Sequence, residues 1–206
     1  MLRRSLTLAC AAMLGACAAS APRGTAPLSD GLRADVAILE TTDLHTHVLS
    51  YDYDRGRVED SGGFDRVATL IRQARAEFAN SLLIDDGDTL QGTALADYQA
   101  LVQRPACGQK LAMHKAMDAL GYDAGTIGNH EFNYGLPFLA QVTGTPMPGA
   151  GVDSPRCAGP AYPLVLSNVF GAHDGKPLYA PYAVIERRFS AYTADGTQVP
   201  VPLKVG

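Results

Sequence analysis

Three short apolar segments of the chain, each typical of a buried strand, end in metal-ligating side chains. They are residues 35–41 followed by Asp43 and His45, residues 81–85 followed by Asp88, and residues 123–127 followed by Asn129 and His130. Helical patterns lie between them, and this alternation predicts a parallel sheet. Because ligands in such sheets bind at the carboxyl ends of the strands, the three polar groups are expected to form one metal site.

The segments between the strands carry the spacing of amphipathic helices. A helix that opens at Gly62-Gly63 is predicted to bury one face, whose apolar positions are Phe64, Val67, Leu70, Ile71, Ala74 and Phe78. Residues 87–98 are predicted to be a loop. A second helix is predicted over residues 109–120, with Gly121 as its C-terminal cap.

The later part of the chain predicts a fourth strand and a hairpin. Residues 143–163 are dense in Pro and Gly and indicate a long loop, and residues 164–169 fit a strand. Residues 182–189 and 198–205 alternate around Ala194-Asp195-Gly196, which is typical of a β-hairpin.

Length and charge limit the classes of function. The 206 residues suffice for one modest domain with its own core, and the 47% of hydrophobic residues fit a globular protein. The net charge is −4 and no basic stripe is present, so a groove for a nucleic-acid polymer is not expected.

The N-terminus has the layout of an export signal. Arg3 and Arg4 precede a short apolar stretch, and Leu14-Gly15-Ala16-Cys17 resembles a bacterial lipobox. We expect a signal peptide over residues 1–16, an acylated Cys17 and a flexible tether over residues 17–34. The expected location is the periplasm or an outer-membrane anchor in a Gram-negative bacterium. An ordinary signal cleaved nearby and twin-arginine export are the alternatives.

Two cysteines remain in the body of the domain after such a signal. Cys107 and Cys157 both stand in loop sequence rich in Gly or Pro. In an exported protein they can form a disulfide, and two free thiols are an equal alternative.

The polar residues at the strand ends suit a pair of divalent cations. Asp43 and His45 can bind one ion, Asp88 can bridge, and Asn129 can offer a carbonyl oxygen to a second ion. This oxygen and nitrogen set suits Mn, Fe, Zn, Co or Mg without choosing among them. Such a pair generates hydroxide near neutral pH and clamps a phosphate for in-line attack.

Three longer motifs in this order resemble the calcineurin-like metallophosphoesterases, in their 5′-nucleotidase branch. They are Thr41-Thr42-Asp43-Leu44-His45, Gly87-Asp88-Thr89-Leu90-Gln91-Gly92 and Gly128-Asn129-His130-Glu131-Phe132. Tyr51-Asp52-Tyr53 and Asn133-Tyr134-Gly135 are similar to the exported bifunctional 2′,3′-cyclic-nucleotide 2′-phosphodiesterase/3′-nucleotidases. The resemblance implies an α/β fold: the N-terminal part of a four-layer sandwich, with a mixed sheet, flanking helices and a late β-hairpin.

The resemblance also implies roles for individual residues. Asp43 and His45 would bind the first of two divalent metals, Asp88 would bridge, and Asn129 would bind the second. His130 would be catalytic, contacting the phosphate and protonating the leaving oxygen. In 5′-nucleotidases an Asp orients this histidine, and Asn133 stands in its place here.

The same resemblance implies that residues 35–206 are a partial domain. The later Gly-His-x-His motif and the nucleotide-binding domain do not follow in this sequence. The expected function is hydrolysis of 2′,3′-cyclic nucleotides and 3′-nucleotides, impaired by the early end. The alternatives are a 5′-nucleotidase or an inactive lipoprotein with weak metal or phosphate binding. Nucleotides are the expected substrates. A lipid anchor is the expected contact with the membrane, and no protein partner is implied.

Other polar residues have structural interpretations. Glu131 is expected to fix its loop, Asp85 and Asp86 to stabilise a turn, and His114 to lie at the surface or core edge. Asn168 either reaches the phosphate pocket or caps its strand. His47 is expected to be a solvated loop histidine. Tyr51 and Tyr53 are expected either to pack the loop or to line a pocket for the base.

Overall fold

The computed structural model describes residues 30–206 and centres on a four-stranded parallel sheet. Its order is β1-β4-β5-β6, and its strands are β1 (Ala37–Thr41), β4 (Ser81–Asp85), β5 (Ala124–Thr126) and β6 (Leu164–Val165). Each strand is separated from the next by a long connection, which is what parallel neighbours need. The α/β class is confirmed. Where a mixed sheet was expected, this sheet is parallel, and the antiparallel strands pair in two separate ribbons.

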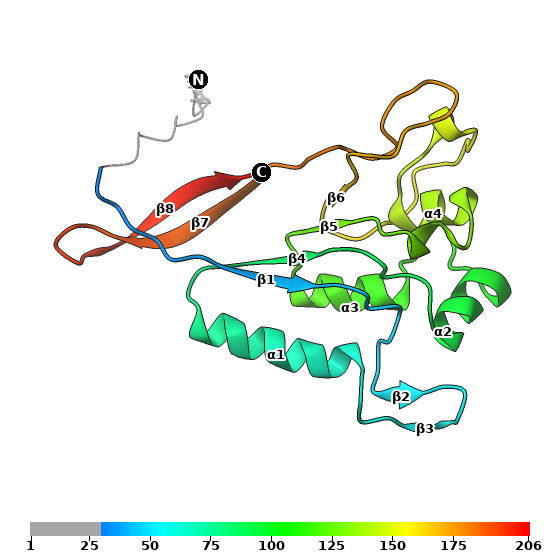
Figure 1. The fold of residues 1–206 in the computed structure, drawn as a ribbon, viewed down its shortest axis with the longest axis horizontal. Coiled ribbons are helices and arrows are strands. Elements are labelled where there is room, and N and C mark those ends of the chain that lie inside the picture. Colours follow the sequence, from blue (N-terminus) through cyan, green and yellow to red (C-terminus); the bar gives the residue numbers. More distant parts are fainter. Residues whose placement is uncertain (1–29) are drawn as a thin grey trace, which may run out of the picture.

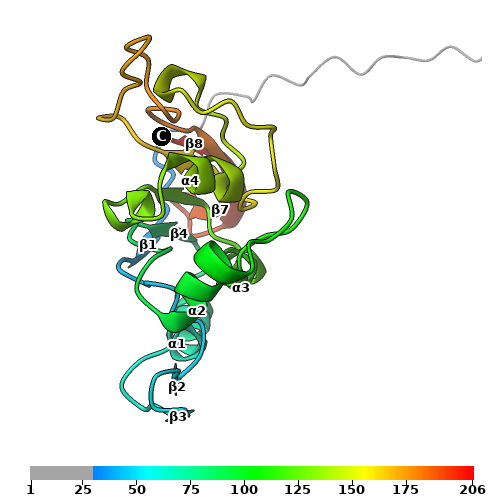
Figure 2. The ribbon, with the colours of Figure 1, turned by 90° about the vertical axis from the view of Figure 1, so that its right-hand side faces the viewer.

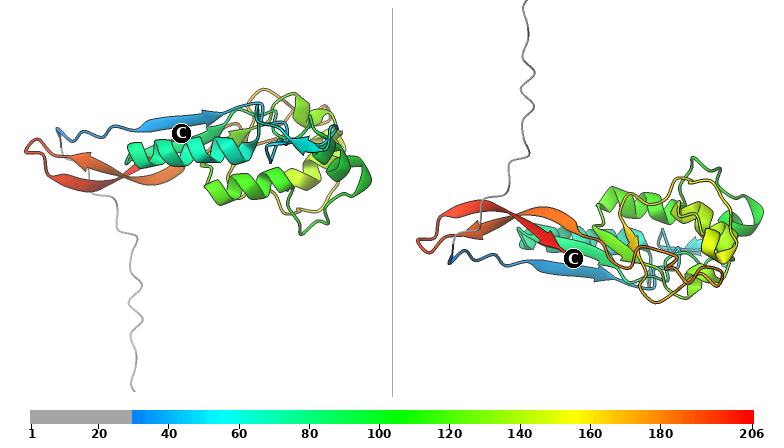
Figure 3. Two further views of the ribbon diagram at one scale, coloured as in Figure 1. Left: turned by 90° about the horizontal axis from the view of Figure 1, so that it is seen from below. Right: turned by 90° about the horizontal axis from the view of Figure 1, so that it is seen from above.

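Two helices cover one face of this sheet (Figures 1 and 3). They are α1 (Phe64–Glu77) and α3 (Ala112–Leu120), and Gly121 ends α3 in a left-handed conformation, as predicted. Their inner faces form one hydrophobic core with the central strand, made of Phe64, Ala68, Ile71, Leu83, Met113, Met117 and Leu120 among others. This core holds β1 and β4, and therefore the loops that follow them, in a fixed position.

The expected buried face of α1 is only partly right. Leu70 is 64% exposed and Phe78 is 44% exposed. At about 100° per residue, the buried Phe64, Ala68 and Ile71 fall in a narrow stripe of about 60°, and Leu70 lies about 100° from Ile71, outside that stripe. Phe78 lies beyond the last helical residue, where the chain turns extended.

A second core surrounds helix α4 (Leu136–Thr143), which follows the third polar motif. It contains the buried face of α4 together with residues from the loops around it: Leu90, Ala100, Leu111, Ile127, Phe138, Leu139, Ala140, Val142, Met147, Leu166 and Tyr179. Short helical turns complete this end: α2 (Ala94–Asp97), η1 (Tyr98–Val102), η2 (His130–Phe132) and η3 (Pro148–Ala150).

Two antiparallel ribbons flank the sheet at opposite ends (Figures 1 and 2). The small one pairs β2 (Tyr51–Asp52) with β3 (Arg57–Val58), and the long one pairs β7 (Ile185–Tyr192) with β8 (Gln198–Val205). Asn80 fixes the long hairpin, because its side chain donates to Ser190 O at 2.8 Å and accepts from Ser190 N at 2.7 Å. The predicted hairpin is confirmed, with its first strand beginning three residues later than expected.

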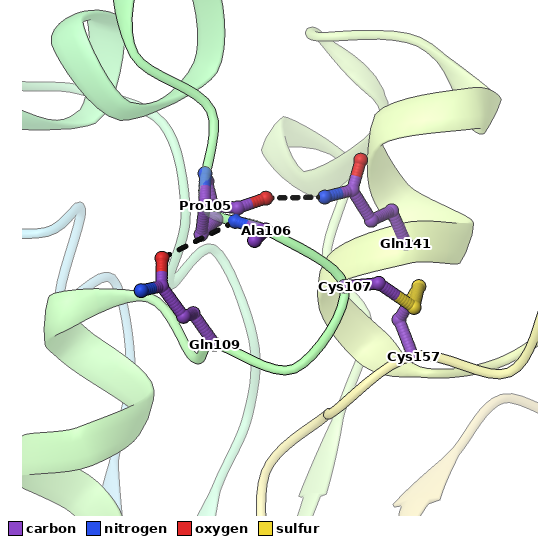
Figure 4. Close-up of a disulfide and its surroundings, with 6 residues drawn as sticks. All are labelled: Pro105, Ala106, Cys107, Gln109, Gln141 and Cys157. Carbon is purple, nitrogen blue, oxygen red and sulfur yellow. Dashed lines mark hydrogen bonds between the residues drawn. A yellow bond between two sulfur atoms is a disulfide. The ribbon is translucent and has the colours of Figure 1, made fainter.

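A disulfide joins Cys107 and Cys157, with their Cα atoms 4.6 Å apart (Figure 4). It links the loop before α3 to the loop after α4. Neighbouring hydrogen bonds hold the loop before α3 in place: Gln141 Nε2 of α4 donates to Pro105 O at 2.6 Å, and Ala158 N of the loop after α4 donates to Cys107 O at 2.7 Å. Of the two alternatives that the sequence left open, the structure has the disulfide.

The expected signal peptide, Cys17 and most of the tether lie outside the described residues. Within residues 30–206, none of the helices combines the length and apolar character needed to span a bilayer.

Candidate metal centre

The loops after β1 and β4 run side by side and bring the first two polar motifs together. Backbone hydrogen bonds join them in register: Asp43 N to Gly87 O at 3.0 Å, His45 N to Asp88 O at 3.0 Å, and Thr46 N to Thr89 O at 2.8 Å. The pairing of β1 with β4 thus continues past both strand ends. It places Asp43 and His45 of the first motif beside Gly87 and Asp88 of the second.

Asp43, His45 and Asp88 form a cluster with the geometry of a metal site. One ligand atom of each lies within 4.8 Å of the other two. His45 Nε2 is 3.5 Å from Asp43 Oδ1. Asp43 is exposed, whereas His45 and Asp88 are half-buried. Two carboxylates and an imidazole at this separation suit a divalent cation, and the predicted convergence of these three residues is confirmed.

The backbone at this cluster is strained. Asp43, His45, Thr46 and Asp88 have φ of 53°, 46°, 56° and 55°, and no other non-glycine residue among residues 30–206 has a positive φ. Positive φ is costly for side-chain-bearing residues and persists only where the surroundings impose it. All three ligand residues therefore adopt a conformation that serves the arrangement of their side chains rather than local stability.

Glu131 holds the second and third motifs together. Its buried carboxylate accepts hydrogen bonds from the backbone N–H groups of Asp88, Thr89, Leu90 and Gly128. The expectation that Glu131 fixes the loop is confirmed. Asp88 is further oriented by His130 N, which donates to Asp88 Oδ1 at 2.8 Å.

Glycine at position 128 makes this close packing possible. A Cβ placed there would lie 2.2 Å from Asp88 Oδ1 and 2.5 Å from Asp88 N. Any side chain at Gly128 would therefore push Asp88 out of the cluster.

His130 lies beside the cluster. Its ring is 5.0 Å from the ring of His45, nearly perpendicular to it. Gln91 contacts both imidazoles: its backbone O is 2.6 Å from His45 Nδ1, and its Oε1 is 2.7 Å from His130 Nδ1. Gln91 belongs to the second motif, and no role was expected for it from the sequence. Its neighbour Gly92, which packs on His45 Cβ, was the available signal.

Two other predicted site residues are less closely tied to the cluster. Asn129 is exposed and immediately precedes His130 at the start of η2, so the chain brings it to the edge of the site. Asn168 is exposed beyond β6, and within the described residues its side chain makes no hydrogen bond to the other candidates.

The neighbouring acidic and aromatic residues follow the structural expectations in most cases. Buried Asp85 accepts hydrogen bonds from Thr41, Thr89 and Gly87, and this last bond shows the expected turn role. Burial raises the pKa of the Asp85 carboxyl.

His47, Tyr51 and Tyr53 line a cavity of about 260 Å³ that reaches Gly92. The two tyrosine rings also pack edge to face at 5.2 Å, so both roles considered for them are compatible with the structure.

The donor set fits a bound cation. The carbonyl of Gln91 can only accept, so His45 Nδ1 carries the hydrogen and its Nε2 lone pair faces Asp43. Metal-bound histidines usually hold their second nitrogen by such a bond. Asp43, His45 and Asp88 would therefore hold the ion. A site of this kind, at the carboxyl edge of a parallel sheet with a histidine alongside, is typical of metal-dependent hydrolases.

The comparison with protein families agrees. Residues 36–191 match the calcineurin-like phosphoesterase family. The chain belongs to this family, whose members are phosphoesterase hydrolases that use divalent metal ions.

Several bacterial enzymes are similar to the chain along most of its length. It is 37% identical to the 2′,3′-cyclic-nucleotide 2′-phosphodiesterase/3′-nucleotidase of Yersinia enterocolitica over 90% of this chain, and 41% identical to that of Haemophilus influenzae over 74%. The chain spans only 25% and 21% of those proteins. Among solved structures, the calcineurin-like phosphoesterase YfkN from Bacillus subtilis is 33% identical, with a TM-score of 0.68 over 83% of this chain and 47% of that one.

Proposed function

We propose that the chain carries the first part of a dinuclear centre that hydrolyses phosphate esters of nucleotides, with 2′,3′-cyclic nucleotides and 3′-nucleotides as substrates. The observation that carries the proposal is the Asp43, His45 and Asp88 cluster with His130 beside it. The substrate class is supported by the similarity to the enzymes of Yersinia enterocolitica and Haemophilus influenzae.

Each residue has a distinct task in this reaction. Asp43 and His45 would hold the first ion, Asp88 would serve both ions, and Asn129 would contribute its carbonyl oxygen to the second ion. When bound, the ions supply Lewis acidity that acidifies a water and offsets phosphate charge. The ion identity, among Mn, Zn, Co, Fe and Mg, is left open by this donor set.

His130 acts at the leaving group. Attack of water on phosphorus breaks the ester P–O bond, and the departing oxygen takes a proton from Nε2 of the His130 imidazolium, which leaves the neutral ring with its hydrogen on Nδ1. Nδ1 is already engaged with Gln91, so Nε2 is the nitrogen free to exchange a proton. Proton transfer by a positioned imidazole contributes about 10²–10⁴-fold to such reactions.

The experiment compares two aspartates that are two residues apart. Asp88→Asn removes the bridging charge and tolerates the left-handed backbone, and Asp86→Asn changes an exposed carboxylate outside the cluster. We expect Asp88→Asn to weaken Mn²⁺ binding, measured by calorimetry, by at least about 10–100-fold. It should also abolish hydrolysis of 2′,3′-cyclic AMP in Mn²⁺, and Asp86→Asn should change neither. Equal Mn²⁺ affinity of Asp88→Asn and the unaltered chain would refute the proposed centre. Assays of 3′-AMP and 5′-AMP in parallel distinguish a cyclic phosphodiesterase/3′-nucleotidase from a 5′-nucleotidase.

We also propose that the protein is exported and acylated at Cys17. The lipobox-like Leu14-Gly15-Ala16-Cys17 supports this, and so does the Cys107–Cys157 disulfide, because disulfides persist in oxidising compartments. Labelled palmitate should enter the chain in a bacterial host and be lost in Cys17→Ser. Absence of label in the unaltered chain would contradict acylation.

A further inference from the structure

Gln91 lies between the two histidines of the site and touches both rings with different atoms. Its backbone O contacts His45 Nδ1 at 2.6 Å and its side-chain Oε1 contacts His130 Nδ1 at 2.7 Å. Gln91 is half-buried in the loop between β4 and α2. One residue therefore fixes the orientation of both imidazoles.

The contact with His45 leaves no choice of tautomer. A backbone carbonyl has only lone pairs to offer, so the hydrogen must be on His45 Nδ1. Nε2 is then unprotonated in the neutral ring, and it is the nitrogen that faces Asp43. Because this bond uses the backbone, it survives any change of the side chain at position 91.

The contact with His130 depends on how the Gln91 amide points. Asn133 Nδ2 donates to Gln91 Oε1 at 3.2 Å, and it also lies 2.9 Å from His130 Nδ1. With Oε1 accepting from both neighbours, His130 carries its hydrogen on Nδ1. In the competing network Nδ1 is bare, and it accepts either from Asn133 Nδ2 at 2.9 Å, with the amides as placed, or from the Gln91 amide nitrogen, with both amides reversed. The two networks differ in the tautomer of His130.

We propose that Gln91 is a positioning residue that holds His130 in the Nδ1–H tautomer with its amide oxygen. Asn133 supports this by donating to the same oxygen. An amide oxygen thereby takes the place of a carboxylate as the partner of His130 Nδ1. The effect on hydrolysis rests on the proposed function, in which His130 Nε2 exchanges the proton; the tautomer itself does not.

The test reads the tautomers directly by nitrogen NMR of the metal-free full-length chain labelled in its histidines. Spectra are recorded near pH 9, well above the ordinary imidazole pKa of about 6.5, so that the rings are neutral. The 5 histidines are assigned by substituting each in turn. We expect both His45 and His130 to show the Nδ1–H pattern.

Three variants separate the oxygen of Gln91 from its bulk. Gln91→Met keeps the length and removes the acceptor, so His130 should move toward the Nε2–H form while His45 stays Nδ1–H. Gln91→Glu keeps an acceptor oxygen and should leave both rings unchanged. Asn133→Asp added to Gln91→Met places a carboxylate at the position 2.9 Å from Nδ1 and should restore the Nδ1–H form.

The outcomes decide the proposal. An Nε2–H pattern for His130 in the unaltered chain overturns it, and so does an unchanged His130 in Gln91→Met or a changed one in Gln91→Glu. If the chain hydrolyses nucleotides, Gln91→Met should lower kcat by about 10–100-fold with KM and Mn²⁺ affinity nearly unchanged. If the chain is inactive, the proposed function fails while the NMR result still supports or overturns the role of Gln91.

Discussion

At the scale of single residues, one carboxylate organises the loops of the site. Glu131 is 2% exposed and accepts four backbone N–H groups, three from residues 88–90 and one from Gly128. These donors come from two different loops, so they have no regular partner in the sheet. Glu131 thus satisfies buried backbone groups and fixes the distance between the motifs that carry Asp88 and His130.

Glu131→Gln should therefore destabilise the protein without altering its shape much. The new amide nitrogen faces N–H donors, which leaves about two of them unsatisfied. Each unsatisfied buried donor costs roughly 1–3 kcal/mol, so the free energy of unfolding should fall by about 3 kcal/mol. Urea denaturation measures it, with the exposed Glu77→Gln as the matched control. A Glu131→Gln variant as stable as the control would show that these bonds contribute little.

At the scale of secondary structure, the sequence predicts the elements whose apolar pattern is long and regular. Strands β1, β4 and β5, helices α1 and α3 and the late hairpin all follow from such patterns. Helix α4 was not predicted, although Pro137 in its first turn and Gly144 after its end are ordinary helix boundaries. Its 8 residues bury most of their surface against loops, so no clear polar face marks it.

The candidate site also combines features that the sequence predicts with features that it does not. Strand order and the carboxyl-edge rule suffice to bring Asp43, His45 and Asp88 together. The left-handed backbone of these residues and the bridging position of Gln91 could not be read from the sequence. Both depend on loop pairing between distant segments rather than on any local preference.

Helix α3 carries a buried histidine, which corrects the expectation that His114 lies at the surface or core edge. His114 is 3% exposed and its Nδ1 has no hydrogen-bond partner. It is three residues before Met117 on the helix, so it shares the face that packs inward. Burial lowers its pKa from 6.5 to about 4, opposed by the nearby charge of Asp118 and assisted by that of Lys110.

This burial predicts a loss of stability in acid. The pKa of His114 is lower in the folded state than in the unfolded state, so the unfolded state binds more protons between pH 6.5 and 4. Stability should fall by about 3 kcal/mol as the pH drops through that range. The raised pKa of Asp85 acts with the opposite sign, so the measurement is the difference between the unaltered chain and His114→Leu. His114→Leu should flatten the profile of unfolding free energy against pH, and the exposed His173→Gln should leave it unchanged. Parallel profiles for the unaltered chain and His114→Leu would contradict the assignment of the acid instability to His114.

At the scale of the whole molecule, two hydrophobic cores share one sheet. The core of α1 and α3 supports the loops after β1 and β4, and the core of α4 supports the loop after β5. Leu164 in β6 packs against both, and the Cys107–Cys157 disulfide links the loop before α3 to the loop after α4. The metal cluster lies where the loops supported by these two cores meet.

Removing the disulfide should therefore loosen the coupling between the cores and lower global stability. The two cysteines are 50 residues apart, and closing a loop of this length in the unfolded chain stabilises the folded state by about 2–4 kcal/mol. The Cys107→Ser/Cys157→Ser variant should unfold at a lower urea concentration by that free energy, with the m-value indicating any change in the surface exposed. Dithiothreitol should lower the midpoint of the unaltered chain to that of the variant and leave the variant itself unchanged. Equal midpoints for the oxidised chain and the variant would show that the hydrogen bonds of Gln141 and Ala158 alone hold these loops.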